Sequence, residues 1–348
     1  SDWSSDVCSS DLDYKRITRA VYHICSEMLV YILFVVGFVL LIKGADWLVS
    51  GSASVAKKYN ISDLVIGLTI VSMGTSMPEL IVNILAGTSG ASEIAIGNVV
   101  GSNIANILLI LGVAAFIYPL TIKESTVMSQ IPFSIIAILL VAFAANAPIF
   151  NPDYSLMISR LDGVVFILFF ALFTVYIIKL AREGRADMIE EAPDKVLPMG
   201  KSILFVLLGM VGLFLGGKWV VDGAIKIAEQ FGLSQNLIGL TIVAIGTSLP
   251  ELVTSAMAAY RKNTDIAVAN VIGSNIFNLL WVLGISAMIS PMKYDPLVNT
   301  DIIVLLVATC LIIFSLMTGR AKNQIGKPTG IFFLACYIAY TAFIIYRG

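Results

Sequence analysis

This chain of 348 residues contains very little histidine and cysteine. It has one histidine, His23, and its four cysteines, at positions 8, 25, 310 and 336, are scattered without a CxxC pair or another metal-ligand spacing. Zinc and copper sites are built mainly from these two residue types, so the sequence argues against such a site. Any metal ion that binds here would need oxygen ligands, as Ca²⁺ does.

Charge is also scarce. Only 13% of the residues are charged, 58% are hydrophobic, and the mean hydropathy is +0.92, whereas a soluble domain is roughly a quarter charged. The net charge of −1 gives no indication of a nucleic-acid partner. The composition therefore predicts one polytopic membrane domain with the lipid bilayer as its partner. It suggests no cofactor and no protein partner.

The first residues, SDWSSDVCSSDL, resemble translated adapter sequence rather than part of a domain. They have no apolar core of the kind that a signal peptide carries. We expect residues 1–26 to be a leader that is partly non-native, and we exclude the first twelve from the fold prediction.

Hydrophobic stretches of about 20 residues predict ten membrane-spanning helices. They cover residues 28–55, 63–87, 94–117, 131–149, 162–180, 201–228, 236–259, 266–290, 301–318 and 329–346. The polar stretch 181–200 would connect a first five-helix repeat, residues 27–180, to a second one, residues 201–348. Because five is odd, two similar units in series must enter the membrane in opposite orientations. We therefore predict an all-α polytopic membrane protein with two inverted five-helix repeats.

Lysine and arginine are concentrated in one set of the predicted loops, and the positive-inside rule places those loops in the cytoplasm. The rich set comprises Lys57, Lys58, Lys123, Arg182, Arg185, Lys195, Lys201, Arg261, Lys262, Arg320, Lys322 and Lys327. The other set has Arg160, Lys293 and Arg347. This bias predicts an inner (plasma) membrane protein with a cytoplasmic 181–200 loop and both termini outside.

The same polar sequence occurs twice within hydrophobic segments. Residues 66–80 read IGLTIVSMGTSMPEL and residues 238–252 read IGLTIVAIGTSLPEL, with twelve of fifteen positions identical. A second pair, GNVVGSNIANILLILG at 97–112 and ANVIGSNIFNLLWVLG at 269–284, follows at the same offset of 172 residues. Each copy places a glutamate, Glu79 or Glu251, at membrane depth, where a carboxylate is costly and marks a functional site. The repeat predicts one site between the two halves.

The residues around each glutamate are suited to binding a hard cation. Pro78 cannot donate a helical hydrogen bond and clashes with the carbonyl of Gly74, which is thereby freed, and a freed carbonyl within a membrane needs another partner. Carboxylate, carbonyl and hydroxyl oxygens are the ligands of such cations. The hydroxyls are those of Thr75, Ser76, Thr247 and Ser248.

The second motif adds a matching pair. Ser102 and Asn106 are four residues apart and so share one helix face, and Ser274 and Asn278 repeat them. An asparagine offers a neutral carbonyl oxygen. Packing, a kink or an interhelical hydrogen bond explains any one of these residues alone. Their joint repetition at one offset favours a cation site.

These motifs resemble the two alpha-repeats of the cation/calcium antiporter superfamily and are similar to those of a prokaryotic sodium/calcium exchanger. The resemblance implies a secondary active antiporter, not an enzyme, that exchanges Na⁺ for Ca²⁺ by alternating access at a shared central site. The first and sixth spans would move against the rest.

The resemblance also implies residue roles. Glu79 and Glu251 would hold Ca²⁺ and share their charge with Na⁺. The backbone carbonyls of Thr75 and Thr247 would join the Ca²⁺ shell. Flanking Na⁺ sites and the remaining central ligands would come from Ser76 with Ser102, Ser248 with Ser274, the carbonyls of Ser72 and Ala244, and the amides of Asn106 and Asn278. Some relatives have Asp where this chain has Asn278, and Asn there favours a potassium-independent exchanger.

Other functions use some of the same features. A Ca²⁺/H⁺ antiporter, or one for another divalent cation, would cycle the same two acids through protonation, although the many hydroxyls favour Na⁺. A cation channel would more naturally place several identical subunits around one pore. An intramembrane hydrolase would need a base near its serine, and the sequence has no HExxH motif and no His or Lys close to the repeated serines.

Overall fold

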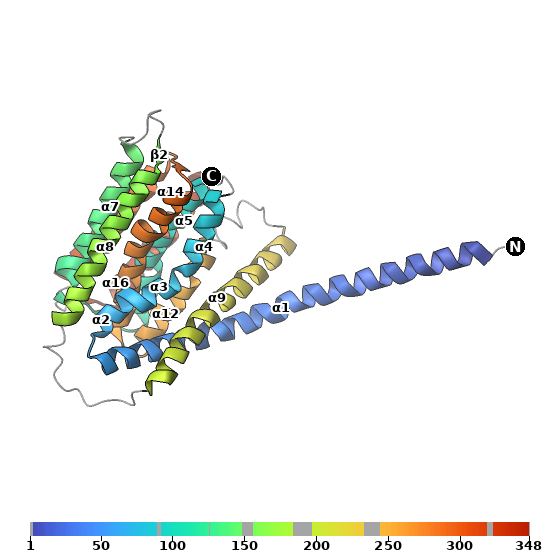
Figure 1. The fold of residues 1–348 in the computed structure, drawn as a ribbon, viewed down its shortest axis with the longest axis horizontal. Helices are drawn as coiled ribbons and strands as arrows, with labels where there is room; N and C mark the ends of the chain where they lie inside the picture. The colour runs from blue at the N-terminus through green and yellow to red at the C-terminus, as the bar shows by residue number, and fades with distance from the viewer. Residues whose placement is uncertain are drawn as a thin grey trace.

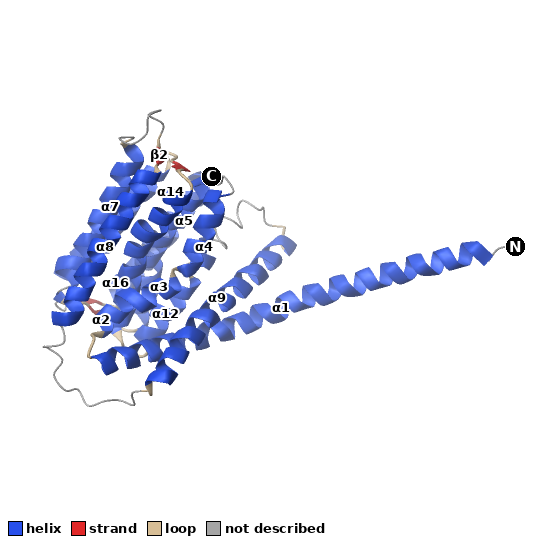
Figure 2. Cartoon of the chain, viewed as in Figure 1, coloured by secondary structure: helices blue, strands red, loops and turns tan. Residues whose placement is uncertain are grey.

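The chain is an almost entirely helical bundle (Figure 2), seen in a computed structural model that describes residues 3–88, 92–124, 126–147, 156–183, 197–232, 244–318 and 323–347. The N-terminal part of the first helix extends away from this bundle (Figure 1). The helical elements of the first half are α1 (Trp3–Tyr59), α2 (Asp63–Ile66), η1 (Gly67–Val71), α3 (Ser72–Thr75), α4 (Met77–Thr88), α5 (Ser92–Ala105), η2 (Asn106–Ile110), α6 (Leu111–Ile117), η3 (Thr126–Gln130), α7 (Ile131–Asn146) and α8 (Arg160–Glu183), where η denotes a π-helix.

The second half has a similar order of elements. Its helices are α9 (Met199–Gln230), α11 (Ala244–Thr247), α12 (Leu249–Tyr260), α13 (Thr264–Ile276), η5 (Phe277–Val282), α14 (Leu283–Ile289), α15 (Val298–Thr318) and α16 (Lys327–Arg347). Four two-residue strands complete the described structure: β1 (Leu120–Thr121), β2 (Met157–Ile158), β3 (Met292–Lys293) and β4 (Gln324–Ile325).

Nine of the ten predicted spans correspond to helical segments that could cross a membrane. Within the described residues, eight helices are long and apolar enough to cross a membrane. The segment from α2 to α4 forms a ninth candidate span, which is bent where α3 meets α4. The predicted span 236–259 begins outside the described residues and continues as α11 and α12. The first helix differs from its prediction, because it starts at Trp3 and runs without a break through the expected leader.

The second repeated motif lies at the centre of the bundle. In the span formed by α13, η5 and α14, 94% of the most apolar 18-residue stretch is buried inside the protein. In the span formed by α5, η2 and α6 the buried share is 72%. The corresponding fraction is only 17% for α8 and for α16, which therefore lie at the periphery. The surrounding helices thus shield the repeated polar residues from lipid.

The two halves of the chain are interleaved. Strand β1 pairs antiparallel with β4, and β2 pairs with β3, so each small sheet joins one half to the other. The peripheral helices cross over in the same way, since α8 packs on α14 and α16 packs on α6. A Cβ at Gly163 would lie 2.7 Å from the Gly284 carbonyl oxygen, and one at Gly330 would lie 2.8 Å from that of Gly112. Neither half is a separate packing unit.

Helices α1 and α9 pack through glycines spaced seven residues apart. A Cβ at Gly37 would lie 2.9 Å from the Gly216 carbonyl oxygen, and one at Gly44 would lie 2.9 Å from that of Gly209. Gly37 of α1 meets Gly216 of α9, and Gly44, further along α1, meets the earlier residue Gly209, so the two helices run antiparallel. Small residues allow such close approach of backbones where lipid gives no hydrophobic driving force.

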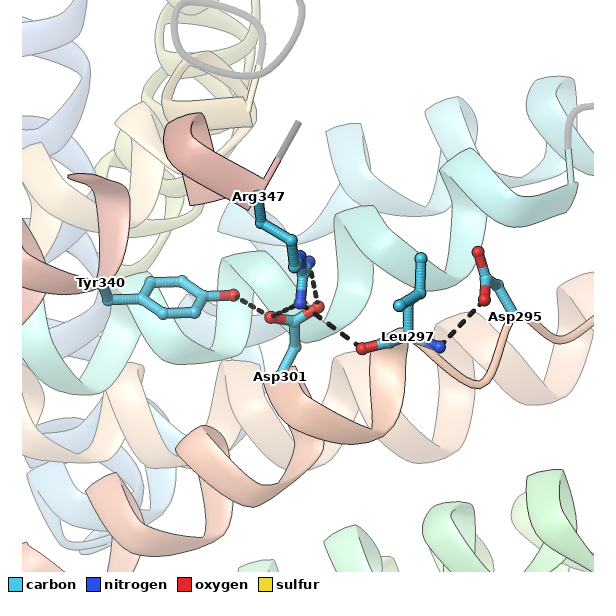
Figure 3. A network of polar contacts seen from close by, with 5 residues as sticks. All are labelled: Asp295, Leu297, Asp301, Tyr340 and Arg347. Carbon is cyan, nitrogen blue, oxygen red and sulfur yellow. Dashed lines mark hydrogen bonds and ion pairs between the residues drawn. The ribbon is translucent and has the colours of Figure 1, made fainter. Parts of the chain in front are cut away.

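An ion pair ties the start of α15 to the end of α16 (Figure 3). Arg347 donates from Nη2 to Asp301 Oδ2 at 2.9 Å and from Nη1 to Oδ1 at 3.2 Å. The Tyr340 hydroxyl also donates to Asp301 Oδ1, at 3.0 Å. Two planar hydrogen bonds give this pair a fixed geometry, which holds the two neighbouring helices at one end.

The close contact of α1 and α9 can be tested by adding one methyl group. In Gly209→Ala the new Cβ would lie 2.7 Å from Leu48 N, so the helices must separate, at a cost of about 1–3 kcal/mol. We expect a lower midpoint of thermal unfolding in detergent. Gly200→Ala, which has no heavy atom within 4 Å of its new Cβ among the described residues, is the matched control and should be neutral or stabilising. Equal midpoints for the two variants would contradict the packing account.

Candidate functional site

The first repeated motif breaks its helix at the same residue in both copies. Ser76 separates α3 from α4 with φ −88° and ψ 7°, and Ser248 separates α11 from α12 with φ −87° and ψ 5°. These angles fall in the sparsely populated bridge region. The helix restarts one residue later, so Pro78 and Pro250 occupy the first turn, where the missing N–H has no intrahelical partner to lose. The predicted proline kink is a helix break, with a bend of 44° in the first copy.

The breaks place both glutamates at the start of a helix. Glu79 is the third residue of α4 and Glu251 is the third residue of α12. The N–H groups of a first turn are unpaired and the helix dipole is positive there, so both favour a carboxylate. Both side chains are fully buried, and Glu251 reaches the break in the first half, where its Oε1 accepts from the Ser76 hydroxyl at 2.8 Å, three residues before Glu79. The two halves thus bring their acids to one region.

Nearly all residues predicted for the site are buried. Ten of the twelve are at most 2% exposed: Ser72, Thr75, Ser76, Glu79, Ser102, Asn106, Ser248, Glu251, Ser274 and Asn278. Thr247 is half-buried, and only the backbone of Ala244 is described, as the first residue of α11.

Many of these buried oxygens have no protein partner. Within the part of the chain that the structure describes, eight side-chain oxygens of the predicted site are buried without a hydrogen bond. They are Glu79 Oε1 and Oε2, Glu251 Oε2, Asn106 Oδ1, Asn278 Oδ1, and the hydroxyls of Ser102, Ser248 and Ser274. A buried polar atom without a hydrogen bond costs roughly 1–3 kcal/mol in proteins, and a buried charge costs more. Such atoms therefore normally have a hydrogen-bond partner. Their accumulation here leaves several oxygens available to bind an ion or water.

Four asparagines join the two copies of the second motif. Asn103 Nδ2 donates to the backbone oxygen of Asn275 at 3.1 Å, and Asn275 Nδ2 donates to that of Asn103 at 3.3 Å. Their side-chain oxygens accept from Asn278 Nδ2 at 3.2 Å and from Asn106 Nδ2 at 2.9 Å. The sequence analysis missed Asn103 and Asn275, although both lie in the GSN motif at the same offset of 172 residues.

A second polar layer lies beside this quartet. Thr75 Oγ1 donates to Asn270 Oδ1 at 3.1 Å, and its counterpart Thr247 donates to Asn98 Oδ1 at 3.3 Å. Each asparagine also holds a residue one turn after a glutamate: Asn270 Nδ2 donates to Ser255 Oγ at 2.9 Å, and Asn98 Nδ2 donates to the Asn83 oxygen at 3.2 Å. The prediction missed these residues too. Reciprocal bonds between the halves therefore fix both broken helices.

The two copies differ in two respects. The Ser76 hydroxyl donates to Glu251 Oε1 at 2.8 Å, whereas Ser248 Oγ is among the unpaired atoms. The Ser72 carbonyl accepts from Ser76 N at 3.0 Å, and it also lies 3.2 Å from Thr75 Oγ1, whose single hydrogen can go either to it or to Asn270 Oδ1. In the second half the backbone N–H of Ser248 donates to the carbonyl oxygen of Ile245, three residues earlier, whereas Ser76 donates to a carbonyl four residues earlier.

The arrangement provides two carboxylates among neutral oxygens, away from lipid and water. Ca²⁺ takes six to eight oxygen ligands of these kinds, and two carboxylates could neutralise one divalent or two monovalent cations. The π-helices η2 and η5 begin at or next to Asn106 and Asn278, and such segments occur frequently at functional sites. The chemistry available is cation binding.

Comparison with known proteins agrees with this geometry. The family model described as "Sodium/calcium exchanger protein" matches residues 29–179 and 201–346. A protein described as the putative antiporter CaxA, from Alkalimonas amylolytica, is 39% identical over 90% of this chain and 98% of its own length. The sodium/calcium exchanger MaX1 of Methanosarcina acetivorans is 33% identical over 91% of this chain and 98% of its own.

A solved structure also resembles this fold. The sodium-calcium exchanger NCX_Mj, soaked with Na⁺, superposes with a TM-score of 0.77 at 34% identity, and the match covers 91% of this chain and 99% of that one. The proteins named here are antiporters or exchangers, and none is described as an enzyme.

The difference between the two serines gives a prediction about the ion-free protein. Ser76→Ala leaves Glu251 Oε1 buried without its donor, so we expect it to destabilise the fold by about 1–3 kcal/mol. Ser248→Ala removes a hydroxyl that has no partner among the described residues, so its effect should be smaller. Thermal unfolding in detergent, in buffer free of Na⁺ and with a Ca²⁺ chelator, measures both. A larger effect of Ser248→Ala would contradict the assigned hydrogen bond.

Proposed function

We propose that this chain, which belongs to the sodium/calcium exchanger family, exchanges Na⁺ for Ca²⁺ across the membrane by binding them in turn at one central site. The observation that carries the proposal is the set of eight buried, unpaired oxygens on repeat-related residues. Glu79 and Glu251 would be the shared anionic ligands. Asn106, Asn278 and the repeated serines and threonines would supply neutral oxygens.

Competition for the two carboxylates would couple the two fluxes. One Ca²⁺ or two Na⁺ ions balance two negative charges, whereas both loads together would leave excess positive charge in a region of low dielectric, where charges repel strongly. The site would therefore release one kind of ion before it takes the other. Binding of either kind would also satisfy the oxygens that the fold leaves unpaired.

Alternating access would come from two inverted five-helix repeats, residues 27–180 and 201–348, joined by the loop 181–200. The antiparallel packing of α1 on α9 through reciprocal glycines is consistent with that symmetry. These two helices form the pair that would move against the remaining helices, opening the site to one side and then the other.

We further propose an inner-membrane location with both termini outside. Basic residues gather at the end of the bundle that carries the β1–β4 pair. Lys123 forms an ion pair with Asp265 at 2.6 Å, and Lys262 lies over the ring of Tyr118. The positive-inside rule would make this end cytoplasmic. The opposite end, with the β2–β3 pair, would face outward.

The second candidate is a Ca²⁺/H⁺ antiporter that uses the same acids. Glu79 and Glu251 are both fully buried, and either carboxylate could carry a proton in place of Na⁺. The neutral hydroxyl and amide oxygens favour Na⁺, because proton transfer does not need a cage of such ligands.

The decisive experiment is Ca²⁺ uptake into proteoliposomes loaded with Na⁺. We expect uptake that requires an outward Na⁺ gradient and that falls at least about a hundredfold in Glu79→Gln and in Glu251→Gln, because each removes one of the two compensating charges. Ser129→Ala, a hydroxyl variant in η3, is a control that should retain uptake. Uptake driven by a pH gradient and indifferent to Na⁺ would establish the second candidate instead.

Reporter fusions test the proposed orientation. Alkaline phosphatase fused after Arg347 should be active, because the enzyme folds only outside the cytoplasm. The same enzyme inserted in the 181–200 loop should be inactive. A fluorescent protein at the same two positions should give the opposite pattern. Phosphatase activity from the loop insertion would reverse the orientation.

A further inference from the structure

We propose that Asn103 and Asn275 are positioning residues that orient the amides of Asn278 and Asn106 so that their carbonyl oxygens face the cation. This inference rests on the proposed cation site and assigns a role to residues outside its ligand set. It depends on which end of each of the four amides is already occupied.

The hydrogen bonds determine the orientation of every amide in the quartet. Asn103 must turn its nitrogen toward the Asn275 backbone oxygen, because a backbone oxygen can only accept. Its own oxygen is then left to accept, and the donor it meets is Asn278 Nδ2 at 3.2 Å. Asn278 therefore has its nitrogen committed and its oxygen on the other branch of the amide. That oxygen is buried and unpaired.

The other half repeats the arrangement. Asn275 donates to the Asn103 backbone oxygen and accepts from Asn106 Nδ2 at 2.9 Å, which leaves Asn106 Oδ1 buried and unpaired. The helix that carries each acid lies nearby across the repeat, since α12 packs against η2 and α4 packs against η5. Both free amide oxygens thus lie in the region of the carboxylates.

The oxygen and nitrogen ends of an asparagine amide have nearly the same size. Without the bonds to Asn275 and Asn103, the amides of Asn106 and Asn278 could therefore turn over. A released amide could turn its NH₂ group toward a carboxylate of Glu79 or Glu251, which would pair the carboxylate in the ion-free state and compete with a cation. Outer-shell partners of metal ligands commonly act in this way, by fixing ligand orientation before the metal arrives. Asn103 and Asn275 are themselves held by the backbone of the opposite half. The orientation of the proposed ligands and the packing of the two halves therefore depend on the same four residues.

A double-mutant cycle separates orientation from simple support of the fold. Asn103→Ala should raise the apparent KM for Ca²⁺ in Na⁺-driven uptake by about 10- to 100-fold, the usual effect of losing an outer-shell partner. In an Asn278→Asp background the same change should have little effect, because the two oxygens of a carboxylate are equivalent and need no orienting. A purely structural role predicts the same loss in both backgrounds.

The control is another reciprocally hydrogen-bonded asparagine pair elsewhere in the chain. Asn146 and Asn299 exchange side-chain hydrogen bonds of 2.7 and 2.8 Å at an exposed end of α7 and α15. Asn146→Ala should leave the KM for Ca²⁺ unchanged. If Asn103→Ala does not fold, the mirror cycle of Asn275→Ala with Asn106→Asp gives the same test.

The outcomes distinguish this inference from the function on which it rests. If the parent protein shows no Na⁺-driven Ca²⁺ uptake, the proposed function fails. If the parent transports Ca²⁺ but Asn103→Ala has an unchanged KM, or an equal loss in both backgrounds, the positioning role fails while the function stands. Calorimetric titration of purified protein with Ca²⁺ alone should reproduce the KM changes as changes in Kd.

Discussion

The burial of two like charges in a membrane protein is the constraint on which this structure depends. Glu79 and Glu251 are fully buried, and three of their four carboxylate oxygens have no hydrogen-bond partner within the described residues. An isolated buried carboxylate is among the most costly groups that a fold can contain. The breaks at Ser76 and Ser248 reduce that cost by placing each acid in a first helical turn. The cost that remains is what a bound cation would offset in the proposed function.

The positions of these charges are set by contacts between the halves rather than within them. The asparagine quartet, the two threonine–asparagine bonds and the Ser76–Glu251 bond all connect one half to the other. The peripheral helices and the short strands are exchanged in the same sense. Because both asparagines, both threonines and Glu251 of the predicted site have a partner in the opposite half, a small shift between the halves would move several of these groups together. The proposed alternation between two states would use this coupling.

The repeat is not perfectly symmetric, and the differences fall at the site. Ser76 donates to Glu251, but Ser248 makes no corresponding bond to Glu79. One turn beyond the acids, Asn83 in the first half corresponds to Ser255 in the second. Asn83 Nδ2 is a buried donor without a partner in the described structure, whereas Ser255 accepts from Asn270. The two acids therefore have unequal surroundings, so the free energy of an ion at each carboxylate need not be equal.

The sequence alone determined the membrane class, nine of the spans and the identity of the buried acids, because hydropathy and an exact offset of 172 residues are local properties of the chain. It also predicted Asn106 and Asn278 as site residues, because each repeats on the same helix face as a serine, and the structure buries both. It did not distinguish a kinked helix from a broken one. It also gave no role to Asn98, Asn103, Asn270 or Asn275, since an asparagine in a membrane helix can equally be a ligand, a packing residue or an orienting partner. Only the tertiary structure gave the partners of Asn103 and Asn275, because these lie 169 to 175 residues away and come within reach only when the halves interleave.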